Sequence, residues 1–198
     1  LVTLTANEQA AYSAAAGSQG LQRYHDRTKT SRSVSGLVPA VVAWLTGPVG
    51  MTHLRTVVFT ENMDVLEPLR RAIERQRIPV WTITGKMQAK HRDESVNAWS
   101  RGPGGVLLGT GAVETGLNLQ AGSALVTVVQ SWNPERERQR EGRLVRLGSE
   151  HSTVVHQVIR PDVPLEWWKD AKHEMKQQLA DRVLKSVPTG VAAGATHA

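Results

Sequence analysis

The sequence contains no cysteine among its 198 residues. The chain can therefore form neither a disulfide bond nor a thiolate metal site, a composition typical of a reducing compartment. No apolar run reaches the length of about 20 residues that crosses a bilayer, and the longest covers residues 37–45. The N-terminus lacks a basic region followed by an apolar stretch and a cleavage site. We expect a protein that is neither secreted nor membrane-bound, located in the cytoplasm or nucleoid, or in the nucleus of a eukaryote.

Two motifs that nucleotide hydrolases carry are missing as well. The sequence has no G-x-x-x-x-G-K-[ST] phosphate loop and no D-E-x-x motif for magnesium and water activation. We therefore expect no group in this chain to hold a β-phosphate with its magnesium ion, and we predict no metal site. The fingerprint G-x-G-x-x-G is absent after the first strand, which argues against a dinucleotide-dependent enzyme.

The chain is basic, with a formal charge of +6 and a pI of about 10.1. This balance favours a polyanionic partner, nucleic acid first. A hydrophobic content of 40% suffices for a core, and the length suits one α/β domain with an appendage. Leu1 stands where a complete chain begins with Met, which indicates a segment of a longer protein.

Strand-like and helix-like segments alternate along the chain. Continuous β-branched and apolar runs predict strands at 55–60, 79–84, 106–108, 124–129 and 154–159. A short strand and a helix are expected within 1–12, where Thr5 and Glu8 form a capping box. Further helices are predicted at 36–47, 63–76, 90–99, 165–185 and across 139–146, with a polar loop at 17–35 and a flexible tail at 187–198. This alternation predicts a mostly parallel sheet with right-handed crossovers.

Polar or small residues follow several of the predicted strands. Thr60, Gly85, Thr110 and Thr115 lie at or closely after strand ends. The carboxyl ends of parallel strands meet at one edge, where α/β sheets bind ligands. We expect these four residues to cluster at that edge.

Three residues of the charged helix share one face. Gln139, Arg143 and Arg146 are spaced four and three apart, so they project from the same side. The planar guanidinium group of arginine matches phosphate oxygens in geometry. Two guanidinium groups and a glutamine amide on one face therefore suit a triphosphate. The alternative is a solvated helix whose surface carries Glu135–Arg138 and Glu137–Arg140 pairs.

The motifs in this region resemble those of a known family. Residues 139–146 resemble the last motif of superfamily-two helicases, Q/H-x-x-G-R-x-x-R, and residues 115–119 resemble the preceding one. The W-N-P at 132–134 is similar to that of the Swi/Snf-type DNA translocases, and residues 4–12 come close to their L-T-x-x-Q-x-x-x-Y linker. The sequence departs from the Swi/Snf pattern at 113–115, so the resemblance is firmer for superfamily two as a whole.

This resemblance implies a RecA-like three-layer domain that is the second motor lobe of an ATP-dependent helicase or translocase. It divides the chain into an N-terminal linker with helices (1–50), the lobe itself (51–160), a C-terminal brace helix (161–185) and a flexible tail (186–198). ATP would be shared with a missing N-terminal RecA-like lobe that holds Mg²⁺, and this chain alone would not hydrolyse it. The other expected partner is DNA, with RNA not excluded.

The resemblance also implies roles for individual residues. The catalytic arginine fingers would be Arg143 and Arg146. The residues that contact the nucleotide would be Gly116, Asn118 and Gln139. The residues that contact nucleic-acid phosphates would be Thr60, Gly85, Lys86, Thr110 and Thr115.

Other interpretations of these residues remain open. Thr60 or Asn62 can simply cap the next helix. The basic residues of the 17–35 loop, which include Arg32, have two interpretations: they contact a phosphate backbone, or they only face solvent. The pair Trp167 and Trp168 indicates packing rather than base stacking. A rival function is a standalone RecA-like module that binds nucleic acid or protein without nucleotide chemistry.

Overall fold

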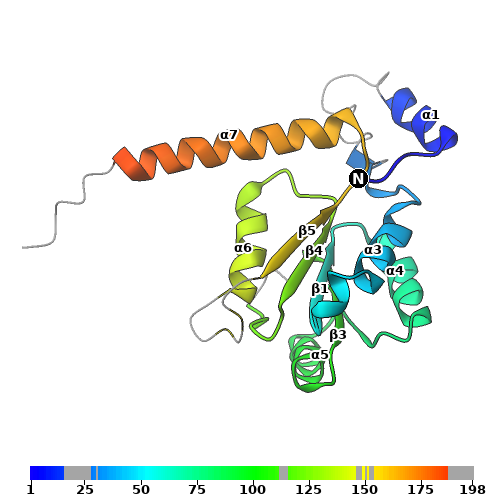
Figure 1. Ribbon diagram of the computed structural model, residues 1–198, viewed down its shortest axis with the longest axis vertical. Helices are drawn as coiled ribbons and strands as arrows, with labels where there is room; N and C mark the ends of the chain where they lie inside the picture. The colour runs from blue at the N-terminus through cyan, green and yellow to red at the C-terminus, as the bar shows by residue number, and fades with distance from the viewer. Residues whose placement is uncertain are drawn as a thin grey trace, which may run out of the picture.

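The computed structural model describes residues 1–15, 28–29, 31–111, 116–145, 149, 151 and 154–186. Within them, five strands form one parallel sheet in the order β2-β3-β1-β4-β5 (Figure 1). The strands are β1 (Arg55–Thr60), β2 (Val80–Ile83), β3 (Gly105–Gly109), β4 (Ala124–Val128) and β5 (Val155–Ile159). The predicted α/β class and parallel sheet are confirmed.

Helices cover both faces of this sheet, as an all-parallel sheet requires. The connecting helices are α3 (Leu37–Thr46), α4 (Met63–Arg75), α5 (Ala89–Arg101) and α6 (Pro134–Leu144). In Figure 1, α3 and α4 lie on one side of the strands, and α6 lies on the other with α5 below. A 3₁₀ turn, η2 (Gly50–Thr52), leads from α3 into β1. The result is a three-layer arrangement.

Two apolar clusters form the core, one on each face. Successive side chains of a strand point to opposite faces, so Val58 joins the cluster of α3 and α4, while Val57 and Phe59 join the other. Trp99 of α5 and Leu144 of α6 complete this second cluster. The central strands are buried on both faces, which explains their uninterrupted apolar runs.

The N-terminal segment packs beside the start of the last helix. Helix α1 (Ala6–Ala14) begins with the predicted capping box of Thr5 and Glu8. The predicted strand before it is reduced to a single bridge between Val2 and Pro161. The backbone N–H of Leu165 donates to the Tyr12 hydroxyl at 3.1 Å. These contacts fasten the N-terminal segment to the chain around the start of α7 (Figure 1).

The last helix, α7 (Pro164–Ser186), projects from the body of the lobe (Figure 1). Several of its large apolar side chains are exposed: Trp167, Trp168, Met175 and Leu179. Among the residues that the structure describes, no helix is long and apolar enough to cross a membrane.

Candidate nucleotide and nucleic-acid interface

The strand ends meet at one edge of the sheet, as predicted. Ile83 and Phe59 both pair with Gly109, so the residues that follow β2, β1 and β3 emerge together. The backbone N–H of Thr110 also donates to the Ile83 carbonyl at 3.2 Å. Gly85, Thr60 and Thr110 therefore share this edge. Thr115 lies outside the described residues.

Accessibility differs among these residues. The side chains of Thr60 and Thr110 are only 1% and 7% exposed, whereas Gly85 and Lys86 are exposed. The Thr60 hydroxyl accepts the backbone N–H of Asn62 at 3.2 Å. Asn62 in turn caps α4 by accepting the N–H of Asp64 at 3.0 Å. The capping interpretation therefore holds for Asn62, and the exposed groups at this edge are Gly85 and Lys86.

The W-N-P segment has a structural role at each position. Trp132 packs edge-to-face on Trp168 of α7 with ring centroids 5.3 Å apart. The side chain of Asn133 accepts the backbone N–H of Glu135 at 3.1 Å and so caps α6. Pro134 occupies the first turn, where its missing N–H costs nothing. The segment starts α6 at a defined position after β4.

Helix α6 presents only part of the predicted arginine face. Gln139 is exposed and Arg143 is half-buried. The helix ends at Leu144, because Val145 adopts extended backbone angles of φ −98° and ψ 99°. The helix therefore ends before the end of the predicted span, 139–146. Arg146 itself lies outside the described residues.

The inner side of α6 carries a buried charge cluster that sequence reasoning missed. Arg140 is 1% exposed and Glu137 is 6% exposed, with 2.6 Å between the Arg140 Nη1 and a Glu137 carboxylate oxygen. The same Glu137 carboxylate accepts the backbone N–H of Ser131 at 2.8 Å. The predicted Glu137–Arg140 pair thus exists, but in the interior instead of on the surface. The other predicted pair, Glu135–Arg138, lies at the surface with 3.6 Å between nitrogen and oxygen.

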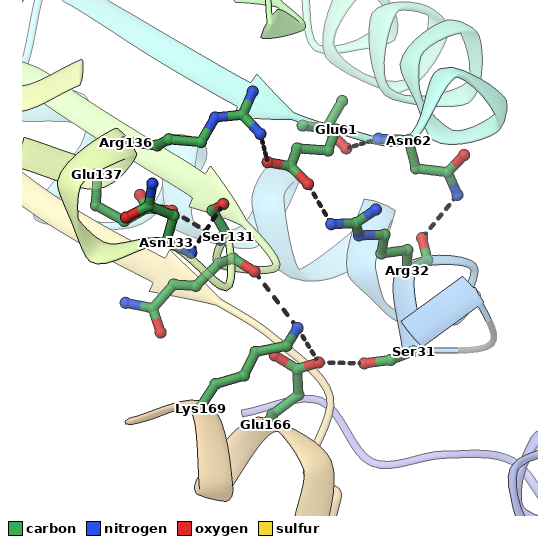
Figure 2. Close-up of polar contacts among 12 residues, drawn as sticks. Ser31, Arg32, Glu61, Asn62, Ser131, Asn133, Arg136, Glu137, Glu166 and Lys169 are labelled. Atoms are coloured by element: carbon green, nitrogen blue, oxygen red, sulfur yellow. Dashed lines mark hydrogen bonds and ion pairs between the residues drawn. The ribbon is translucent and has the colours of Figure 1, made fainter. Parts of the chain in front are cut away.

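The guanidinium of Arg140 also contacts residues at the end of β1. Its carbon lies 3.5 Å from the ring centre of Phe59, and its Nη2 is 3.2 Å from a carboxylate oxygen of Glu61. Figure 2 shows Glu61 between Arg136 and Arg32, which come from opposite sides of this edge. One sequence signal could have revealed the buried face: Leu144, four residues after Arg140, marks it as the apolar side of α6.

A second buried pair joins α7 to the lobe. The Nζ of Lys169 lies 2.7 Å from a Glu166 oxygen, and the Ser31 hydroxyl donates to that oxygen at 2.6 Å (Figure 2). Both side chains have 0% exposure. Burial lowers the pKa of Lys169, and the adjacent Glu166 carboxylate opposes that shift. This contact fixes the direction in which α7 leaves the body.

Gly116 and Asn118 line a hollow of about 490 Å³ beside α5. Gly116 has a φ of +68°, which favours glycine. The Asn118 side chain accepts the backbone N–H of Gln120 at 3.2 Å. The other polar residues of the hollow are Asp93, Asn97, Ser100 and Gln120. Its described lining includes neither Gln139 nor Arg143, so the structure does not gather all the predicted nucleotide contacts in one pocket.

In the described part of the chain, no group of three or more histidine or carboxylate side chains is placed to hold a metal ion.

Comparison with known proteins agrees with these motifs. The model of the helicase conserved C-terminal domain family matches residues 48–148. The putative ATP-dependent helicase/translocase YwqA of Bacillus subtilis is 30% identical over 132 residues, which cover 66% of this chain and 14% of that protein. A SWI/SNF-related chromatin regulator, subfamily A-like protein 1 of Bos taurus, is 25% identical over 131 residues, or 65% of this chain and 14% of the relative. The chain thus spans a small part of these relatives.

Two solved structures share the fold. The Sulfolobus solfataricus SWI2/SNF2 ATPase core in complex with dsDNA aligns with a TM-score of 0.70 at 19% identity, over 94% of this chain and 45% of that one. The C-terminal part of the Fun30 ATPase domain aligns with a TM-score of 0.61 at 19% identity, over 69% of this chain and 44% of that one. These alignments confirm the RecA-like architecture.

Proposed function

The chain belongs to the helicase conserved C-terminal domain family as a Swi/Snf-type second RecA-like lobe, and from this premise we propose that it serves ATP-driven movement on DNA. The chain carries no phosphate loop and no D-E-x-x motif. Hydrolysis therefore needs a first lobe that binds the phosphates and Mg²⁺. We infer that this chain alone is inactive as an ATPase.

The observation that carries the proposal is the exposed face of α6. The helix begins at a fixed cap, Gln139 is exposed and Arg143 is half-buried, while Arg140 and Leu144 hold the helix in the lobe. A guanidinium held this way can reach a nucleotide bound to an opposing lobe. In our proposal Arg143 and Arg146 stabilise charge that develops on the γ-phosphate. Gln139, Gly116 and Asn118 contact the nucleotide.

The strand-end edge supports the DNA part of the proposal. Gly85 and Lys86 are exposed there, and glycine lets a phosphate approach the backbone closely. Thr60, Thr110 and Thr115 complete the proposed set. Contacts of this kind grip phosphates without reading sequence, as a translocating protein requires. One related fold was solved in complex with dsDNA, which favours DNA over RNA as the partner.

Helix α7 suits contact with the missing lobe. It projects from the body and exposes Trp167, Trp168 and Met175. We propose that this helix acts as a brace that packs on the first lobe. ATP binding and release would then shift the two lobes about a hinge and step the protein along the DNA backbone.

The test is Arg143→Ala in the longest natural protein that contains this chain. We expect DNA-stimulated ATP turnover to fall by about a thousandfold, because an arginine finger contributes that much. Arg146→Ala should behave alike, and thermal unfolding should be unchanged. Arg138→Ala is the matched control, since Arg138 lies on the same helix and pairs with Glu135 at the surface. Normal turnover in Arg143→Ala would reject the finger assignment.

The same assay tests the wider proposal. Duplex DNA, single-stranded DNA, branched DNA and RNA should be compared as activators of the wild-type protein. If none stimulates ATP hydrolysis, the motor function is wrong and the chain is a standalone binding module.

A further inference from the structure

The carboxylate of Glu61 contacts three guanidinium groups that come from two separate parts of the chain. It follows β1 directly and is 13% exposed. One of its oxygens lies 3.2 Å from a nitrogen of Arg136 and 3.2 Å from a nitrogen of Arg140, both on α6. Its other oxygen binds Arg32, which precedes α3 (Figure 2). A single carboxylate thus holds α6 and residues 31–36 against the end of β1.

The neighbours of Glu61 in the chain extend this junction. Thr60 closes β1 at the edge proposed to contact DNA. The side-chain amide of Asn62 donates to the Arg32 carbonyl at 3.0 Å and to the Ser33 hydroxyl at 3.2 Å. The same side chain caps α4. Residues 60–62 therefore join the strand edge to α4, to residues 31–36 and to α6.

The negative charge of Glu61 is what attracts the surrounding arginine side chains. Glu61 and Glu137 together face the guanidinium groups of Arg32, Arg136 and Arg140. Loss of the Glu61 carboxylate removes one attraction from each of these three guanidinium groups. Arg136 is the most exposed of the three, at 41%. Glutamine at position 61 would keep the volume and remove this attraction.

We propose that Glu61 is a positioning residue that couples DNA binding at the strand edge to ATP hydrolysis at α6. Through Arg136 and Arg140 it fixes the orientation of the helix that presents Gln139 and Arg143. A phosphate bound beside Thr60 and a nucleotide bound at α6 then act on one rigid junction. This inference rests on the proposed motor function.

Glu61→Gln in the longest natural protein that contains this chain tests the coupling. The readout is the ratio of ATP turnover with saturating duplex DNA to turnover without DNA, so a change in DNA affinity does not enter. We expect this ratio to fall about fivefold or more, the lower bound of typical coupling between sites. Glu67→Gln is the matched control, because Glu67 also binds two arginines, Arg70 and Arg71, but on the outer face of α4. It should leave the ratio unchanged.

A second variant, Glu61→Asp, separates positioning from simple charge neutralisation. Aspartate keeps the negative charge opposite Arg32, Arg136 and Arg140 but is one methylene shorter, so it does not hold all three guanidinium groups in place. If Glu61 only neutralises these arginines, Glu61→Asp keeps the wild-type DNA-stimulated ratio, which would overturn the proposal. If Glu61 positions α6, the ratio falls in Glu61→Asp as it does in Glu61→Gln.

The outcomes also separate this inference from the function on which it rests. A wild-type protein without DNA-stimulated ATPase would refute the motor function itself. A wild-type protein with strong stimulation and a Glu61→Gln variant with the same ratio would refute only the coupling role of Glu61.

Discussion

Arginine serves different purposes at neighbouring positions of α6. Arg138 pairs with Glu135 at the surface, Arg140 lies inside the lobe over Phe59, and Arg143 is half-buried. Spacing along a helix predicts which residues share a face, but it does not reveal which face the fold buries. Leu144 is the one apolar residue that marks the inner side, so the interior position of Arg140 was not predicted from charge pattern alone.

Arg140→Ala should destabilise the lobe strongly. Removal of one partner from a buried ion pair typically costs about 3–5 kcal/mol, and here it leaves the 6%-exposed Glu137 without its guanidinium. The measurement is the free energy of unfolding by urea at neutral pH.

The control for this substitution is Arg71→Ala. Arg71 is 65% exposed and pairs with Glu67 at 2.8 Å on the surface, where an ion pair contributes little to stability. Equal losses of stability in the two variants would show that Arg140 is not held in a buried pair.

Helices and strands were predicted correctly where adjacent residues determine them. The Thr5–Glu8 capping box and the apolar strands appear as predicted, because caps and strand runs depend on adjacent residues. The end of α6 did not follow, since the helix stops at Leu144 although residues 143–146 contain neither Gly nor Pro. Helix propensity is a weak guide to such a boundary.

Helix α1 should loosen from the lobe in acid because of Glu8. The backbone N–H of Ser35 donates to the Glu8 carboxylate at 2.6 Å, and this bond, with those from Thr5, lowers the pKa of Glu8 from 4.5 to about 2. Folding thus favours the ionised form. The stabilisation is present above pH 4.5 and is lost as the pH falls toward about 2.

The measurement is the free energy of unfolding against pH for the wild-type chain and for Glu8→Gln. Since glutamine does not titrate, the wild-type advantage should shrink as the pH falls from 4.5 to about 2. A constant difference across that range would mean that Glu8 does not hold Ser35.

At the scale of the whole molecule, the regular alternation of strands and helices was sufficient to predict the parallel sheet. It also placed Thr60, Gly85 and Thr110 at one edge, because parallel strands end together. The alternation could not predict the charge junction at Glu61. Arg32 and Arg140 are far from Glu61 in sequence, and only the folded sheet brings them to the same carboxylate.

The basic chain and its strand-end edge lead to a prediction about DNA. The lobe should bind duplex DNA without sequence preference, and its affinity should fall steeply with salt as counterions are released. Lys86→Ala should weaken binding equally on all sequences and reduce the slope of log affinity against log salt by about 1. Arg75→Ala provides the comparison, since Arg75 is exposed at the C-terminal end of α4, away from the ends of the strands.

Fluorescence anisotropy with labelled duplexes of unrelated sequence, at several salt concentrations, measures both quantities. If Lys86 contacts a phosphate, Lys86→Ala changes the slope and Arg75→Ala does not. If both variants shift it alike, binding reflects the overall charge of +6 and not the edge of the sheet. A strong preference for one sequence would contradict backbone recognition, because phosphates carry no base information.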